Sequence, residues 1–305
     1  MILLFILFFA LILCFPTQSL SLAANGLQLW FQCMVPALFP FMVLSGILVR
    51  QGLASKMVGF LSPLFCRLYK ISPNGVYCML IGFLCGFPMG ARTVSEFYER
   101  GELSKREAEM LLAYCNNIGP VYYISFLLPT IGLAGSKLPV YLFGMYGIPL
   151  CYGLILRYSG FLLPHENAGT RSLIPPASES IFLSLDQAMQ SAINGITALG
   201  GYMMLFSMCN LLPEAISIIL KNPLPPVLQG CLSCLFEITT GVGKLGDRMP
   251  LFVLILLPLG GLSCIAQTKS MLKNTGLSLG RYLLHKGMQT LLTAGYYLLY
   301  LFFFL

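Results

Sequence analysis

Charged residues are scarce in this chain. Lys and Arg number 18 and Asp and Glu 11 among 305 residues, so 10% of the chain is charged and 57% is hydrophobic. Soluble domains devote about a quarter of their residues to charges, and the mean hydropathy here is +0.82. These values exclude an ordinary soluble enzyme. They indicate an all-α, polytopic membrane protein, because each membrane-spanning helix needs about 20 mainly apolar residues.

The sequence also lacks the signatures of several other protein classes. It contains no HExxH motif and no Gly-rich phosphate-binding loop followed by Lys-Ser/Thr, so we expect neither an enzyme nor a resident cofactor. The basic residues are scattered through loops and are not interleaved with aromatic residues, which argues against a nucleic-acid partner. Most of the 11 cysteines lie in apolar segments, where Cys behaves as a small hydrophobe, and no metal site is expected.

Apolar segments predict about seven membrane-spanning helices. They cover Ile2–Phe15, Leu27–Val49, Ala108–Leu133, Leu138–Leu156, Leu183–Leu212, Leu251–Leu272 and Tyr282–Leu305. The first segment precedes PTQSLSLAANG and resembles a signal peptide with cleavage near Ala24, but no Lys or Arg precedes it, so a retained helix is preferred. Gly52–Ile71 mixes apolar and basic residues and predicts a helix at the membrane surface.

Two further apolar stretches are interrupted near their middle or end. Residues 74–91 read NGVYCMLIGFLCGFPMGA, and residues 223–243 read PLPPVLQGCLSCLFEITTGVG. Broken backbone at membrane depth must be buried in protein or line a wet cavity, so both stretches predict re-entrant hairpins. The spans at 108–133 and 251–272 are themselves broken, the first at Asn116–Pro120 and the second at Gly260–Ser263.

The basic residues are distributed unevenly between the two sides of this topology. Fourteen of the 18, Lys286 among them, fall on one side and four on the other. Because Lys and Arg accumulate on the cytoplasmic side, the split predicts a cell-membrane protein with its N-terminus cytoplasmic and its C-terminus outside. Residues 159–182, with His165, form a cytoplasmic connector, and Ser104 with Glu107 forms a capping box.

The order of span, hairpin and broken span occurs twice. The first repeat covers residues 27–158 and the second covers 183–273, with flanking helices at 1–26 and 274–305. By the predicted topology the two hairpins enter from opposite sides, which makes the repeats inverted. Inverted repeats are typical of secondary transporters with a substrate site at the membrane midplane.

Four segments carry a resemblance to a known family. LIGFLCGFPMGAR, AYCNNIGPVY, LFEITTGVG and GGLSCIAQ resemble the motif blocks of the nucleoside-recognition (Gate) membrane family, especially its sporulation integral membrane branch. That family is distantly similar to concentrative nucleoside transporters. The resemblance implies a homo-oligomer that passes a small polar organic solute, either a nucleoside-like heterocycle or a small aromatic dicarboxylate such as dipicolinate. A coupling ion, where one is used, would be Na⁺ or H⁺.

Carrying these motifs over places candidate substrate-binding residues at both turns and both breaks. They are Gly86, Pro88, Gly90, Ala91, Asn116, Asn117, Glu237, Thr239, Thr240, Ser263 and Gln267. Small residues at a turn let backbone N–H groups approach a ligand, and Asn, Thr, Ser and Gln side chains both donate and accept hydrogen bonds. The alternative interpretation is that these side chains satisfy freed backbone groups and bridge helices.

Glu237 is the one carboxylate expected inside an apolar stretch away from any loop. A carboxylate at the midplane costs a few kcal/mol and is a functional candidate, so Glu237 is expected to hold a cation, carry a proton or bind the solute. The alternative is a structural acid that is either protonated or paired with a lysine, with Lys244, seven residues further on, as a distant partner. A polar stripe of Gln187, Gln190, Asn194 and Thr197 shares one helix face and is expected to face the protein interior.

Two other functions are compatible with the sequence. One is a divalent-metal pore similar to the gate of bacterial ferrous-iron transporters, although the spacing of Cys85 before Gly86 and Pro88 departs from that pattern. The other is a sporulation membrane scaffold without transport activity. The expected partners are therefore a small-molecule solute and membrane lipid.

Overall fold

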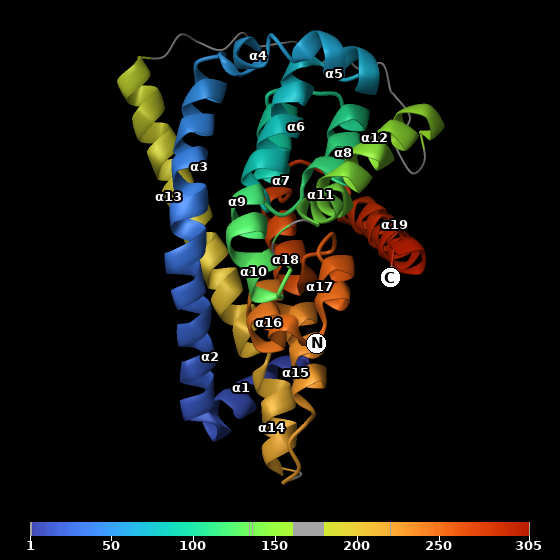
Figure 1. Cartoon of the computed structure of the whole chain (residues 1–305). Coiled ribbons are helices and arrows are strands. Elements are labelled where there is room, and N and C mark those ends of the chain that lie inside the picture. The colour runs from blue at the N-terminus through green and yellow to red at the C-terminus, as the bar shows by residue number, and fades with distance from the viewer. Residues whose placement is uncertain (1, 134, 136, 161–179, 220, 305) are drawn as a thin grey trace.

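The computed structural model describes residues 2–133, 135, 137–160, 180–219 and 221–304, and these residues form helices and connecting loops without any strand. The predicted all-α class is confirmed. Most of the predicted connector, including His165, lies outside the described residues. Figure 1 shows a long helix pair on one side of the molecule, shorter helices in the centre and the C-terminal helix on the opposite side.

The helices fall into three groups along the chain. The N-terminal group contains α1 (Ile2–Cys14), α2 (Pro16–Leu29), η1 (Trp30–Met34), α3 (Val35–Arg50), α4 (Ala54–Met57) and α5 (Ser62–Tyr69). The middle group contains α6 (Pro73–Cys85), α7 (Met89–Glu99), α8 (Lys105–Cys115), α9 (Pro120–Tyr122), η2 (Tyr123–Leu127), α10 (Leu128–Thr130), α11 (Leu138–Leu142), η3 (Phe143–Gly147) and α12 (Ile148–Ser159). The C-terminal group contains α13 (Ile181–Met208), α14 (Leu211–Ile219), α15 (Pro226–Phe236), α16 (Ile238–Leu245), η4 (Gly246–Arg248), α17 (Pro250–Leu256), α18 (Gly261–Met271) and α19 (Leu279–Phe304).

Five helices among the described residues are long and apolar enough to cross a membrane. They are Pro16–Arg50, Lys105–Thr130, Leu138–Ser159, Ile181–Ile219 and Pro250–Met271. The protein is therefore a helical membrane protein by length and composition of its helices. The total of about seven spans stays a prediction. The helix that ends at Arg50 begins at Pro16, earlier than the expected Leu27, because Pro suits the first turn of a helix.

Three π-helical turns, η1, η2 and η3, interrupt otherwise α-helical spans. Each ends two residues before a proline: Pro36, Pro129 or Pro149. Proline has no N–H, and its ring clashes with the carbonyl one turn earlier. A wider π turn at that point relieves the clash while the helix continues.

Helix α13 packs along the continuous helix α2–η1–α3 (Figure 1). The contact is close because small residues face each other, and a Cβ atom at Gly46 would lie 3.0 Å from the Cβ of Ala188. The prediction that the polar stripe faces the interior is wrong: Gln190, Asn194 and Thr197 are exposed on the described chain. The interior face of α13 is formed by small and apolar side chains instead.

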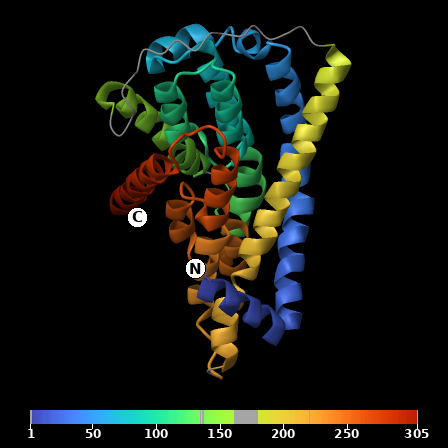
Figure 2. The ribbon, with the colours of Figure 1, turned by 180° about the vertical axis from the view of Figure 1, so that it is seen from behind.

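Two helical hairpins fill the centre of the molecule. Helices α6 and α7 form the first, and α15 and α16 form the second. Figures 1 and 2 show that α6 begins near α4 and α5 at one end of the molecule, whereas α15 begins near α14 at the other. The two turns thus point toward each other, which places the candidate site between them.

Two serine caps position the first hairpin and the helix behind it. Ser72 accepts a hydrogen bond from the N–H of Gly75 at the start of α6, and Ser104 accepts one from Glu107 N–H at the start of α8. The predicted Ser104 cap is confirmed. The Glu107 carboxylate accepts hydrogen bonds from the backbone N–H of Ser72 at 2.6 Å and its hydroxyl at 2.8 Å. One carboxylate therefore joins the starts of both helices.

Candidate functional site

The first hairpin turns at Gly86, Phe87 and Pro88. Gly86 has a φ of +83°, a conformation that L side chains rarely adopt. A Cβ atom on this residue would lie only 2.3 Å from the backbone nitrogen of Gly119. The turn therefore contacts the broken helix backbone to backbone. Gly86 and Pro88 shape this contact.

The first break lies between α8 and α9, at residues 116–119. The side-chain oxygen of Asn116 accepts a hydrogen bond from Ala91 N–H at 3.2 Å, in the first turn of α7. Its amide donates to the Thr268 hydroxyl at 3.1 Å and the Tyr282 hydroxyl at 3.2 Å. At Gly90, a Cβ atom would lie 3.0 Å from the Asn116 Cα. Asn116 thus caps the first hairpin and connects it to α18 and α19.

Glu237 forms the turn of the second hairpin and is 2% exposed. Its carboxylate caps α16, accepting hydrogen bonds from Thr239 N–H at 3.1 Å and Thr240 N–H at 2.6 Å. Two backbone donors and the helix N-terminus stabilise negative charge at this buried position. Lys244 pairs with Glu214 at 3.2 Å, so the alternative of a Glu237–Lys244 pair is wrong.

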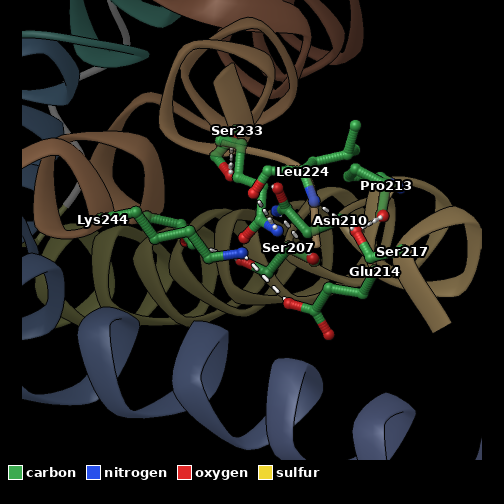
Figure 3. A network of polar contacts seen from close by, with 10 residues as sticks. Ser207, Asn210, Pro213, Glu214, Ser217, Leu224, Ser233 and Lys244 are labelled. Atoms are coloured by element: carbon green, nitrogen blue, oxygen red, sulfur yellow. Dashed lines mark hydrogen bonds and ion pairs between the residues drawn. The ribbon is translucent and has the colours of Figure 1, made fainter. Parts of the chain in front are cut away.

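A polar network holds the second hairpin against α13 and α14 (Figure 3). The hydroxyls of Thr240 and Ser207 lie 3.1 Å apart. Asn210 donates to the Ser207 carbonyl at 2.9 Å and accepts a hydrogen bond from the Ser233 hydroxyl. Thr240 therefore contributes to packing of the hairpin, as the structural alternative proposed.

The second break separates α17 from α18. Gly260 and Gly261 both adopt positive φ, +72° and +78°, and a Cβ atom at Gly261 would lie 2.7 Å from the Cys234 carbonyl oxygen. Only glycine allows this approach of the break to the second hairpin. One turn further along α18, Gln267 donates to the Ser263 hydroxyl at 3.0 Å.

A small cavity lies where both turns and both breaks meet. Its volume is about 70 Å³, and residues of η1, α3 and α13 form part of its lining. Three polar residues predicted for the site line it, namely Glu237, Thr239 and Gln267, and the buried hydroxyl of Tyr122 belongs to the same lining residues. The remaining lining is mainly apolar, so the few polar groups would fix the orientation of a bound molecule.

The other predicted site residues surround this cavity without lining it. They are Gly86, Pro88, Gly90, Ala91, Asn116, Asn117, Thr240 and Ser263. Gly86, Gly90, Ala91 and Asn116 join the first hairpin to the first break. Thr240 instead contacts Ser207 of α13, and Ser263 accepts a hydrogen bond within α18. The structure therefore brings all 11 residues to one region, and places three of them at the cavity.

Sequence reasoning missed a second polar group in the same region. Lys286 is counted above with the basic residues of the cytoplasmic side, although it falls inside the predicted span Tyr282–Leu305, and it is fully buried in α19. Its ammonium donates to the Asn117 side-chain oxygen at 2.8 Å and to Gln289 at 3.1 Å. Removing Lys286 from the earlier split leaves 13 of 17 basic residues on one side. The signal available in the sequence was the pair Lys286 and Gln289 inside an apolar helix.

A second buried carboxylate was also missed. Glu109 in α8 is 4% exposed, so Glu237 is not the one interior acid. Unlike Glu237, it has a cationic partner, because Arg281 donates to it at 2.6 Å and the backbone N–H of Ser278 at 3.3 Å. The pair joins the beginning of α8 to the beginning of α19. Its partners account for its burial without a functional role.

The arrangement defines a class of protein: a polytopic helical membrane protein in which two opposed hairpins and two broken helices enclose one cavity. Residues 33–149 match the model of the Gate family, described as nucleoside recognition. That range contains the whole first hairpin and the first break.

A particular relative extends the similarity to most of the chain. The sporulation integral membrane protein YlbJ of Bacillus subtilis (strain 168) is 23% identical over 304 residues, which cover 88% of this chain and 74% of that protein. These findings confirm the predicted resemblance to the nucleoside-recognition and sporulation membrane proteins. No solved structure matches the chain.

Proposed function

We propose that the protein is a membrane transporter or facilitator of a small polar organic solute. The observation that carries this proposal is the convergence of two hairpin turns and two helix breaks on one cavity lined by Glu237, Thr239 and Gln267. The match to a nucleoside-recognition family and the similarity to a sporulation membrane protein support it.

The hairpins have the dimensions of re-entrant elements. Helix α6 has 13 residues and α15 has 11, which correspond to about 20 Å and 16 Å at 1.5 Å per residue. The hydrocarbon core is about 30 Å thick, so neither helix crosses it. Entering from opposite ends, the hairpins form an inverted repeat whose site lies near the midplane. We propose, from the distribution of the basic residues, that the N-terminus is cytoplasmic and the C-terminus outside.

The volume of the cavity bears on the transport cycle. About 70 Å³ accommodates a few water molecules, whereas sites for organic ligands enclose about 300–1,000 Å³. The structure therefore corresponds to a contracted site. We infer that the hairpins and breaks move relative to α3 and α13 to admit solute, first from one side and then from the other.

The solute is a nucleoside-like heterocycle or a small aromatic dicarboxylate such as dipicolinate. Thr239 and Gln267 can donate and accept hydrogen bonds, as recognition of either class requires. Glu237 would carry the coupling Na⁺ or H⁺ or bind the solute directly. Because Glu237 lies at the turn of the second hairpin, binding of a cation or proton to its carboxylate would favour one position of that hairpin over another.

The test is uptake by liposomes that contain the purified chain. We expect wild-type protein to accumulate labelled dipicolinate or a labelled nucleoside, measured with and without a Na⁺ gradient and with and without a pH gradient. Glu237→Gln should reduce uptake at least about tenfold, the expected cost of losing a hydrogen bond to a charged group. Glu99→Gln, at an exposed glutamate of α7, is the matched control.

Wild-type uptake by the Glu237→Gln variant would refute the role of Glu237. Absence of flux for every organic solute would refute transport, and flux of Fe²⁺ or Mn²⁺ alone would replace the solute with a divalent cation.

A further inference from the structure

Lys286 is a buried ammonium group at the centre of the molecule. It is 0% exposed and lies in the first half of α19. Its nitrogen donates to the side-chain oxygens of Asn117 and Gln289. It also lies 5.4 Å from the centroid of the Phe87 ring and 5.9 Å from that of Tyr282. All of these contacts are with neutral groups.

Lys286 forms no ion pair with any described residue. The ion pairs among the described residues use other cations: Glu96 binds Arg50 and Arg100, Glu109 binds Arg281, and Glu214 binds Lys244. The end of α8 at Cys115 is close by, since Gln289 donates to the Ala113 carbonyl, and a helix C-terminus supplies partial negative charge. That partial charge does not neutralise a full positive charge in a dry interior.

Packing alone does not require a lysine here. A glutamine at position 286 would satisfy the side chains of Asn117 and Gln289 without a buried charge, because an amide also donates and accepts. A fully buried cationic side chain that has no counter-charge among the described residues of a helical membrane protein is a candidate for a functional site. The chemistry that complements it is an anion.

Phe87 connects this lysine with the cavity. The Phe87 ring lines the cavity, and the same ring lies over the Lys286 ammonium. Phe87 belongs to the turn of the first hairpin, between Gly86 and Pro88. A movement of that turn would therefore expose the ammonium to the contents of the cavity.

We propose that Lys286 binds a carboxylate of the solute once Phe87 moves aside, and so selects anionic over neutral solutes. This inference rests on the proposed function and narrows its solute to the aromatic dicarboxylate class. Asn117 and Gln289 hold the ammonium in place until the carboxylate arrives. Glu237 lies on the second hairpin and Lys286 on α19 beside the first hairpin, so the two side chains belong to different elements.

Binding to purified, detergent-solubilised protein tests the assignment directly. Thermal unfolding is measured with pyridine-2,6-dicarboxylate, with its dimethyl ester, with uridine and with sodium chloride at matched concentrations. The dicarboxylate should raise the unfolding temperature of the wild type, because a ligand that binds the native state stabilises it. The ester, which keeps the ring and lacks the charges, should not.

Variants locate the effect at position 286. Lys286→Gln and Lys286→Met should weaken dicarboxylate binding at least about tenfold, and Lys286→Arg should retain part of it. Lys269→Gln, at an exposed lysine of α18, should bind as the wild type does. The ester comparison uses the wild-type chain alone, so it tests the anion requirement even where a variant does not fold.

Several results would overturn the assignment. They are dicarboxylate binding that is unchanged in Lys286→Gln or Lys286→Met, equal stabilisation by the ester or by sodium chloride, and no stabilisation of the wild type by the dicarboxylate. Binding that depends on Lys286 without flux in liposomes would refute transport and leave the anion site standing. Flux in liposomes that does not depend on Lys286 would refute the anion site and leave transport standing.

Discussion

The two hairpins differ in the group that caps the N-terminus of their second helix. Each has a second helix whose first N–H groups lack partners within the helix. In the first hairpin, Asn116 of the broken helix supplies the acceptor for Ala91 N–H. In the second, Glu237 within the hairpin itself binds Thr239 and Thr240 N–H. The first hairpin therefore depends on its neighbour, whereas the second carries its own cap and its own charge.

A shared feature makes this difference informative. Both hairpins press against the break of their own repeat through glycine, Gly86 against Gly119 in one and Gly261 against the Cys234 carbonyl in the other. The packing is thus alike in the two repeats, and the caps differ. Removing a cap should destabilise the first hairpin together with the broken helix, but the second hairpin more locally.

The largest expected effect comes from filling the backbone contact of the first hairpin. Gly86→Ala would place a Cβ atom 2.3 Å from Gly119 nitrogen at a φ of +83°, and should lower the free energy of unfolding by about 3 kcal/mol or more. Gly243→Ala, where no atom lies within 4 Å of the added Cβ, should be neutral or slightly stabilising. Thermal unfolding in detergent compares the two, and equal melting temperatures would contradict the backbone contact.

An intermediate effect is expected for Asn116→Ala. The substitution removes three buried hydrogen bonds, to Ala91, Thr268 and Tyr282, and should lower the free energy of unfolding by about 2–3 kcal/mol. Denaturant titration in detergent measures the loss. Asn194→Ala, on the exposed face of α13, should leave the free energy of unfolding almost unchanged. A loss comparable to that of Asn116→Ala would contradict the stabilising role given to the three hydrogen bonds of Asn116.

The smallest effect on stability is expected for Glu237→Ala. Loss of an N-cap side chain costs about 0.5–2 kcal/mol, and the remainder of the second hairpin is held by the contacts between α15 and α16 and by the Ser207 network. The same denaturant titration applies, with Glu99→Ala as control. A loss larger than that of Asn116→Ala would reverse the comparison between the two hairpins.

Much of the architecture could be predicted because glycine and proline mark where helices break. The interruptions at Gly86–Pro88, Asn116–Pro120, Glu237 and Gly260–Ser263 all correspond to turns or breaks in the structure. Each has a local cause in backbone conformation, so a single sequence carries the information. The same applies to the capping serine at position 104.

The remaining features depend on contacts between segments far apart in the sequence. Lys286 lies inside the predicted span Tyr282–Leu305, but its partner Asn117 is 169 positions away, so no local pattern predicts that they meet. The stripe on α13 was assigned to the interior because polar groups usually avoid lipid. The actual interior face is set by the small residues Ala188 and Ala192, which fit closely against α3.

The π turns have a geometric consequence for the cavity. A π turn contains one residue more than an α turn, and each residue of an α-helix advances the side chains by about 100° around the axis. Met34 ends η1, and Ala37, Leu38 and Phe41, which follow it, line the cavity. If this one turn became α-helical, the cavity-lining residues of α3 would rotate around the helix axis relative to Trp30. The indole N–H of Trp30 donates to the Ile196 carbonyl of α13. The shape of the cavity is therefore set by helix phase as well as by the positions of the hairpins.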